Sequence, residues 1–151
     1  MNETAILTAI LGGVGFMLLA GHSDSSSGDT PNCKQPPAPS PQIGQMAAAI
    51  AQAEGSNPAW NNPGSLTASF GYATTGVGNS AGVLIFATCT DGWNALYAQL
   101  SAIVSGNSRY GLDTTLASFG MSYSGGDPNW AKNVASLLGV STNTTLGSVL
   151  T

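Results

Sequence analysis

The stretch that most constrains the fold is an amphipathic segment that ends at a single glutamate. Its apolar residues recur at helical spacing, which predicts a helix with one buried face. These residues are Ile43, Met46, Ala47, Ile50 and Ala51. Gly55 follows and predicts the end of the helix, because glycine readily adopts the left-handed conformation found there. Glu54 therefore lies in the last helical turn, beside a polar, turn-forming loop from Ser56 to Gly64.

Two interpretations of Glu54 follow from this position. It is the only glutamate beyond residue 3, in a chain with 7% charged residues against roughly 25% in typical soluble proteins. A carboxyl group at the end of an apolar helix is poorly hydrated and holds its proton more readily, as a general acid must. The alternative is an ordinary solvent-facing glutamate near a helix end. Position alone leaves both interpretations open.

The charge balance argues against a nucleic-acid partner. The chain has a net charge of −4 and an isoelectric point near 4.3. Nucleic-acid binding requires clustered lysines or arginines that displace counterions. The basic residues, Lys34, Arg109 and Lys132, are scattered along the chain. We therefore expect no nucleic-acid partner.

Cysteine and histidine usage excludes several kinds of catalytic site. Cys33 and Cys89 are the only cysteines, and they lack the spacing of a zinc site. The only histidine, His22, precedes the predicted domain, so no imidazole stands beside a serine or cysteine nucleophile. We expect neither a metal nor another cofactor. In an oxidising compartment the two cysteines could pair and hold the linker to the domain, and the alternative is that Cys89 is simply buried.

Residues 4–21 form an uncharged apolar stretch ahead of the predicted domain. At about 1.5 Å per residue, a helix of this length spans about 27 Å, close to the ~30 Å hydrocarbon core of a bilayer. A cleaved signal peptide is the alternative, but such peptides begin with basic residues, and this chain begins Met-Asn-Glu-Thr. We expect an uncleaved transmembrane anchor.

Residues 22–42 are rich in serine, aspartate and proline and show no apolar periodicity, which predicts a disordered linker. A flexible coil of this length spans about 25 Å, so the linker holds the domain roughly tens of ångströms from the membrane. The chain thus divides into an anchor over residues 4–21, a linker over residues 22–42 and a folded domain over residues 43–151.

The middle of the domain predicts a small hairpin followed by a second long helix. Residues 66–72 and 82–87 have the composition of strands and are separated by a turn rich in glycine, threonine, asparagine and serine. A helix capped by Thr90 or Asp91 follows, carries a long apolar stripe and ends at Gly106.

The end of the chain predicts shorter helices. Asp113 is placed to cap a helix over residues 116–119, and Asp127 with the following proline opens a helix that ends at Gly139. A last turn ends near Leu150, and we find no internal repeat. The fold class is therefore α+β and mainly helical.

Several short motifs occur in a characteristic order. They are AIAQAEG, WNNPGSL, VLIFATCTDGWNALYAQL, YSGGDPNW and NVASLLGV, and the resemblance that they carry covers about residues 43–146. In order and spacing the chain resembles a group of small phage and bacterial cell-wall lytic domains with the lysozyme-like fold. The resemblance implies a helical domain with a small β-hairpin, and a cleft between the two parts.

The resemblance also implies the residues of the site and its substrate. Glu54 would be the catalytic acid, Asn61, Asn62 and Gly64 would shape the loop beside it and bind substrate, and Tyr123 would line the cleft. Taken alone, the loop residues predict only a tight turn and Tyr123 a packed core aromatic. The implied substrate is peptidoglycan, cleaved between N-acetylmuramic acid (MurNAc) and N-acetylglucosamine (GlcNAc).

The remaining carboxylates favour one kind of glycosidic cleavage. Hydrolases generally use a second carboxylate as nucleophile or as base for water. Asp91, Asp113 and Asp127 each stand at or beside a predicted helix start, where capping occupies them. We therefore expect a lytic transglycosylase in preference to a hydrolase. Asp91 is the residue that could change this expectation, because it follows the hairpin and could face the cleft.

A membrane-anchored domain of this kind would face the cell wall, either outside the cytoplasm of a bacterium or from the membrane of a virion. It would open the wall locally, during phage entry or envelope remodelling. The alternative, from another class, is a non-catalytic structural or glycan-binding protein of a virion or envelope, because fold analogy does not establish catalysis. Glu54 separates the two, since a binding module tolerates glutamine there.

Overall fold

The computed structural model describes residues 33–151, and the expected anchor over residues 4–21 lies outside the described residues. Among residues 33–151, no helix combines the length and the hydropathy that crossing a membrane requires. This part of the chain is mainly helical and carries a two-stranded antiparallel hairpin. The predicted class, α+β and mainly helical, is confirmed.

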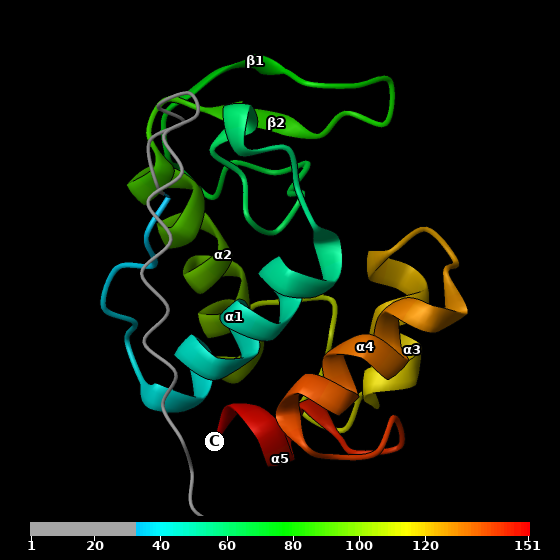
Figure 1. Cartoon of the computed structure of the whole chain (residues 1–151). Coiled ribbons are helices and arrows are strands. Elements are labelled where there is room, and N and C mark those ends of the chain that lie inside the picture. The colour runs from blue at the N-terminus through cyan, green and yellow to red at the C-terminus, as the bar shows by residue number, and fades with distance from the viewer. Residues whose placement is uncertain (1–32) are drawn as a thin grey trace, which may run out of the picture.

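Helix α1, Pro41–Glu54, runs through the centre of the domain (Figure 1). The side-chain oxygen of Ser40 caps it by accepting a hydrogen bond from the backbone N–H of Ile43 at 3.2 Å. Gly55 ends it in the left-handed conformation, with φ 54°. The predicted helix and its end are confirmed, so Glu54 is the last helical residue.

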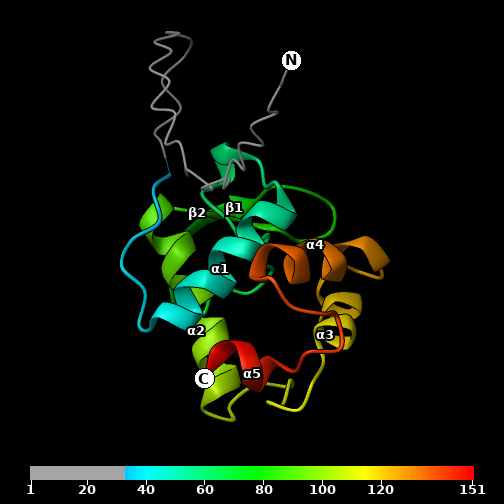
Figure 2. The same ribbon diagram turned by 60° about the horizontal axis from the view of Figure 1, so that its bottom comes forward.

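Helix α2, Cys89–Val104, packs beside α1 (Figure 2). Its cap is Thr88, whose hydroxyl accepts a hydrogen bond from the N–H of Asp91 at 3.1 Å and donates one to the Asp91 carboxylate at 2.7 Å. The predicted cap at Thr90 or Asp91 is therefore wrong, because this reciprocal pair starts the helix earlier. The core lies between α1, α2 and the C-terminal helices, and its fully buried members include Met46, Ile50, Leu96, Leu100, Ile103, Phe119 and Val134.

Strands β1, Thr74–Val77, and β2, Leu84–Phe86, form the antiparallel hairpin at the top of Figure 1. The strand predicted over residues 82–87 is confirmed by β2. The strand predicted over residues 66–72 is wrong, because Ser65 and Phe70 have positive φ angles of 49° and 51° that turn the chain. The hairpin therefore begins later than predicted, and residues 66–72 become part of the loop that leads into it.

A short 3-10 helix and three further α-helices complete the domain: η1, Pro58–Trp60; α3, Leu116–Tyr123; α4, Pro128–Leu138; and α5, Leu146–Leu150. Asp127 caps α4 and Gly139 ends it, as predicted. The predicted cap of α3 is wrong, because Thr115 takes that position in place of Asp113. Helix α4 packs on both α1 and α3, and this packing places the α3–α4 pair beside the central helix α1 (Figures 1 and 2).

The segments in which α3 and α5 begin share the pattern Thr-Thr-Leu-x-Ser, over residues 114–118 and 144–148. They pair with each other: the N–H of Leu116 donates to the carbonyl of Thr144 at 2.9 Å, and the N–H of Leu146 donates to the carbonyl of Thr114 at 2.8 Å. This pairing satisfies backbone groups that helix starts leave free. The expectation of no internal repeat is therefore corrected, and the short repeat holds α5 beside the start of α3.

Residues 33–40 lie along α2, although the sequence predicts them in a disordered linker (Figure 1). Cys33 and Cys89, whose pairing the sequence left open, form a disulfide with their Cα atoms 5.4 Å apart. The hydroxyl of Tyr97 donates to the carbonyl of Pro36 at 2.7 Å, across 61 positions of sequence. Because such partners are distant in sequence, local periodicity does not predict this packing. Pro41 and Gln42, also expected in the linker, belong to α1.

Candidate active site

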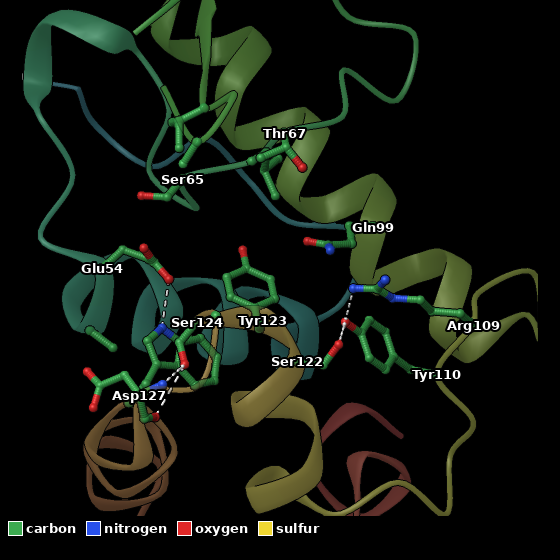
Figure 3. A pocket seen from close by; sticks show the side chains of 16 residues that line it. Glu54, Ser65, Thr67, Gln99, Arg109, Tyr110, Ser122, Tyr123, Ser124 and Asp127 are labelled. Atoms are coloured by element: carbon green, nitrogen blue, oxygen red, sulfur yellow. Dashed lines mark hydrogen bonds between the residues drawn. The ribbon is translucent and has the colours of Figure 1, made fainter. Parts of the chain in front are cut away.

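A cleft of about 560 Å³ opens where the end of α1, the loop before the hairpin and the α3–α4 pair meet (Figure 3). Its volume falls within the roughly 300–1,000 Å³ typical of ligand pockets. Carboxyl, hydroxyl and amide groups from distant parts of the chain face it, including those of Glu54, Ser65, Thr67, Gln99 and Ser122. This lining suits a polar ligand with many hydrogen-bonding groups.

Glu54 lies half-buried at one side of this cleft. The indole N–H of Trp130 donates a hydrogen bond to Oε1 of Glu54 at 2.7 Å, as Figure 3 shows. Trp130 belongs to α4 and is only 4% exposed, so the bond comes from a rigid part of the core. The carboxyl group is therefore held in place at the edge of the cleft, as a group that takes part in chemistry needs to be.

An aromatic cluster makes the wall that carries Trp130 rigid. Tyr123 stacks on Trp130 with ring centroids 4.9 Å apart, and Phe119 contacts these two rings at 5.1 Å and 5.7 Å. Tyr110 meets Phe119 edge to face at 4.8 Å. Each such pair contributes about 0.5–1.5 kcal/mol beyond the burial of its area. The cluster therefore fixes the position of Trp130, and with it that of Glu54.

Tyr123 lines the cleft, and its hydroxyl donates a hydrogen bond to the carbonyl of Gly64 at 2.6 Å. Burial raises the pKa of the Tyr123 phenol well above its ordinary value, and the nearby Glu54 and Tyr110 raise this pKa further. The phenol therefore stays protonated at neutral pH. It acts as a hydrogen-bond donor that ties α3 to the loop, and it is not suited to act as a base.

Asn61 and Asn62 do not line the cleft, and their side chains tie the loop to the hairpin. The amide of Asn62, 2% exposed, donates to the carbonyls of Leu66 and Leu84 at 2.9 Å and 2.8 Å. The amide of Asn61 donates to the carbonyl of Phe86 at 3.1 Å. Because these donors are used within the protein, the two residues shape the loop, and they do not reach into the cleft.

Two glycines let this loop lie directly against α2. A Cβ on Gly64 would come within 3.0 Å of both Leu96 and the Tyr123 hydroxyl, and a Cβ on Gly92 would overlap the carbonyl oxygen of Asn61. Gly64 does not line the cleft either. Its role is to allow the close approach that places the loop beside Glu54.

Asp127 is the second carboxylate that lines the cleft. Its Oδ1 accepts a hydrogen bond from the backbone N–H of Asn129 at 2.8 Å, which caps α4. Asp91, which the sequence allowed to face the cleft, does not line it, and neither does Asp113. Asp127 is thus the carboxylate best placed to assist Glu54, although it already has a structural partner.

Sequence reasoning missed most residues that line the cleft, among them Gln99, Arg109 and Trp130. Trp130 lies in the helix predicted after Asp127, and only the tertiary structure shows its indole N–H directed at Glu54. Gln99 gave a weak signal, as a polar residue next to the apolar stripe of its helix. Arg109 is the only arginine of the chain, but no sequence pattern links it to Glu54.

Comparison with protein-family models, with curated proteins and with solved structures finds no match for this chain. Within residues 33–151, no three His, Cys, Asp or Glu side chains gather where they could hold a metal ion. The geometry of the cleft is therefore the basis on which a function is argued.

Proposed function

We propose that this protein is a membrane-anchored peptidoglycan lytic enzyme that cleaves the MurNAc–GlcNAc bond as a lytic transglycosylase. The observation that carries the proposal is Glu54, half-buried in a polar cleft and held by the indole of Trp130. A carboxyl group fixed at the edge of such a cleft is what protonation of a glycosidic oxygen requires.

In the proposed reaction Glu54 is both acid and base. Its carboxyl group protonates the glycosidic oxygen, the bond from that oxygen to C1 of MurNAc breaks, and GlcNAc leaves as an alcohol. The carbonyl oxygen of the substrate's own N-acetyl group stabilises the positive charge at C1. The Glu54 carboxylate then takes the proton of the 6-hydroxyl as that oxygen attacks C1, which closes a 1,6-anhydro ring. The products together have the composition of the substrate, so no water is consumed.

The carboxylates of the domain favour this reaction over hydrolysis. Retaining and inverting hydrolases place a second carboxylate about 5–9.5 Å from the acid. Asp127 is the only other carboxylate lining the cleft, in the part of the chain that the structure describes, and its oxygen caps α4. In the proposed reaction Asp127 therefore serves as a helix cap, and Glu54 acts without a second carboxylate.

The proposed location is the wall-facing side of a membrane, with residues 4–21 as the anchor. The enzyme would act from a bacterial envelope or from a virion membrane, as in local wall opening during entry. The Cys33–Cys89 disulfide supports a location outside the reducing cytosol, where disulfides persist. The linker up to residue 32 would then set how far the domain reaches from the membrane.

Zymography of the whole chain on purified peptidoglycan tests the proposal. We expect wild-type protein to clear the wall and Glu54→Gln to lose this activity while its circular dichroism spectrum stays unchanged. Asp113→Asn is the matched control, because it also removes one carboxylate but lies exposed outside the cleft. Mass spectrometry should find muropeptides ending in 1,6-anhydro-MurNAc. A wild type that binds peptidoglycan without releasing products, with Glu54→Gln binding equally well, would instead identify a non-catalytic glycan-binding module.

A further inference from the structure

The side of the cleft away from Glu54 carries a polar atom without a partner. Oε1 of Gln99 is buried and accepts no hydrogen bond within residues 33–151. Figure 3 shows the Gln99 amide across Tyr123 from Glu54, among the side chains that line the cleft. Buried polar groups nearly always have a partner, so an exception inside a cleft points to a donor supplied by a ligand.

A positive charge lies beside this acceptor. Arg109 lines the same cleft, and its contacts are with Tyr110: the guanidinium donates to the Tyr110 hydroxyl and lies 4.8 Å from the ring centroid. Neither contact neutralises the charge. In a chain with a net charge of −4, this is the only basic residue that lines the cleft in the part of the chain described. A guanidinium in this setting is suited to a planar anion such as a carboxylate.

A second hollow of about 410 Å³ adjoins the cleft at these two residues. The two cavities share a wall that includes Thr67, Gln99 and Arg109, and the second extends to Phe70. Phe70 is 40% exposed, so its side chain is accessible to a ligand in this hollow. The groove therefore runs from Glu54, past an unpaired acceptor and a cation, to an exposed aromatic ring.

We propose that this end of the groove binds an acidic peptide branch of the substrate and makes the enzyme prefer peptide-bearing glycan strands. Oε1 of Gln99 accepts a hydrogen bond from a peptide N–H, Arg109 pairs with a peptide carboxylate, and Phe70 contacts the apolar part of the branch. The inference rests on the proposed function, which places the glycan at Glu54. Peptidoglycan carries short peptides with free carboxylates on its MurNAc residues, whereas an unsubstituted GlcNAc polymer offers no anion to Arg109.

The test is a binding measurement that needs no turnover. The whole chain carrying Glu54→Gln is titrated calorimetrically with MurNAc-L-Ala-D-Glu, with the same molecule whose carboxylates are amidated, and with the neutral GlcNAc tetramer. We expect the acidic ligand to bind about fivefold more tightly than the amidated one, because a partly exposed charge pair contributes up to about a factor of five. Added salt should reduce this preference.

Two variants in the same background assign the effect to residues. Arg109→Gln should abolish the preference for the acidic ligand, whereas Lys132→Gln, which removes an exposed charge outside the cleft, should keep it. Gln99→Leu should weaken both peptide ligands about fivefold and leave the neutral tetramer unaffected, because both peptides carry the N–H that Gln99 accepts. Arg109 is exposed, so its replacement is expected to leave the fold intact.

The outcomes separate this inference from the proposed function. Wild-type protein that cleaves the wall but shows no preference for the acidic ligand would overturn the peptide site and leave the lytic activity standing. An Arg109→Gln variant that weakens the neutral tetramer as much as the acidic ligand would assign the groove to sugar and also overturn it. A preference that Arg109→Gln abolishes would support the peptide site, even if zymography failed to show cleavage.

Discussion

The indole N–H of Trp130 lies 2.7 Å from Oε1 of Glu54 and joins residues that are 76 positions apart in sequence. The bond connects the end of α1 to the first turn of α4, the two elements that form the two sides of the cleft at this point. Stacking against the ring of Tyr123 also fixes the orientation of the indole. One contact therefore couples the packing of the C-terminal helices to the position of the proposed acid.

Trp130→Phe should separate this contact from the packing, because it keeps an aromatic ring but removes the N–H donor. We expect kcat to fall about tenfold with little change in KM, since an acid that is no longer held in place reacts less often. Steady-state kinetics on solubilised peptidoglycan measures both constants. An unchanged kcat would show that the indole only packs.

The end of α1 could be predicted because the signals are local: apolar spacing, and Gly55 after the last helical residue. Its start lies earlier than predicted, because Pro41 continues a proline-rich stretch that has the composition of a linker. Local signals also predict the start of α4, where Asp127 and Pro128 are adjacent. The cap of α3 could not be predicted in this way, since Asp113 and Thr115 are both good caps. Thr115 is selected because its segment pairs with the segment of Thr145, thirty positions further on.

The residues of the candidate site also differ in how far local sequence predicts them. Glu54 could be predicted as a candidate because local sequence signals mark the end of its helix. Gln99 and Arg109 could not, because tertiary packing alone brings them to the cleft. Asn61 and Asn62 fall between the two cases. Their turn was predictable, but the buried hydrogen bonds that direct their amides to the hairpin depend on where β2 lies.

Gly92→Ala should destabilise the domain, although alanine is favoured over glycine in helices by about 1 kcal/mol. The new methyl group would overlap the Asn61 carbonyl and push the loop away from α2. Overpacking of this kind typically costs about 1–3 kcal/mol. Urea unfolding followed by circular dichroism measures the change. Gly76→Ala is the control, because nothing lies within 4 Å of the position its Cβ would take; equal stability of both variants would contradict the close approach.

Reducing the Cys33–Cys89 disulfide should lower the free energy of unfolding by about 2–4 kcal/mol, because the bond closes a loop between residues 56 positions apart and restricts the unfolded chain. Urea unfolding with and without a reductant measures the change. The double variant Cys33→Ala, Cys89→Ala is the control and should not respond to the reductant.

Tyr123 should make the domain less stable at alkaline pH. Its pKa in the folded protein is raised, so above pH ~10 the unfolded chain loses this proton while the folded protein keeps it. The folded state then binds more protons, and the free energy of unfolding falls as pH rises, by up to about 1.4 kcal/mol per pH unit for this group. Below pH ~9 Tyr123 should cause no such slope. Urea unfolding at several pH values between ~8 and ~11 measures this dependence of the free energy of unfolding on pH. Tyr123→Phe should reduce the slope, to which Tyr97 still contributes because burial also raises its pKa, whereas a variant as steep as wild type would exclude Tyr123 as the cause.

Asp127→Asn decides whether Glu54 acts with a second carboxylate. Asparagine caps helices as well as aspartate does, so the variant keeps the hydrogen bond to Asn129 and removes only the charge and basicity. If Asp127 serves only as a cap, wall cleavage should stay within about twofold of wild type, since less than ~0.5 kcal/mol of transition-state stabilisation is then lost. Asp127→Ala should lose about 1 kcal/mol of stability, yet at a temperature where it is folded it should release the same 1,6-anhydro products.

A hydrolase with a carboxylate pair would behave differently: Asp127→Asn would lose activity about as severely as Glu54→Gln, and wild type would release reducing-end MurNAc. Product mass distinguishes the two reactions directly, because the anhydro product is lighter by one water.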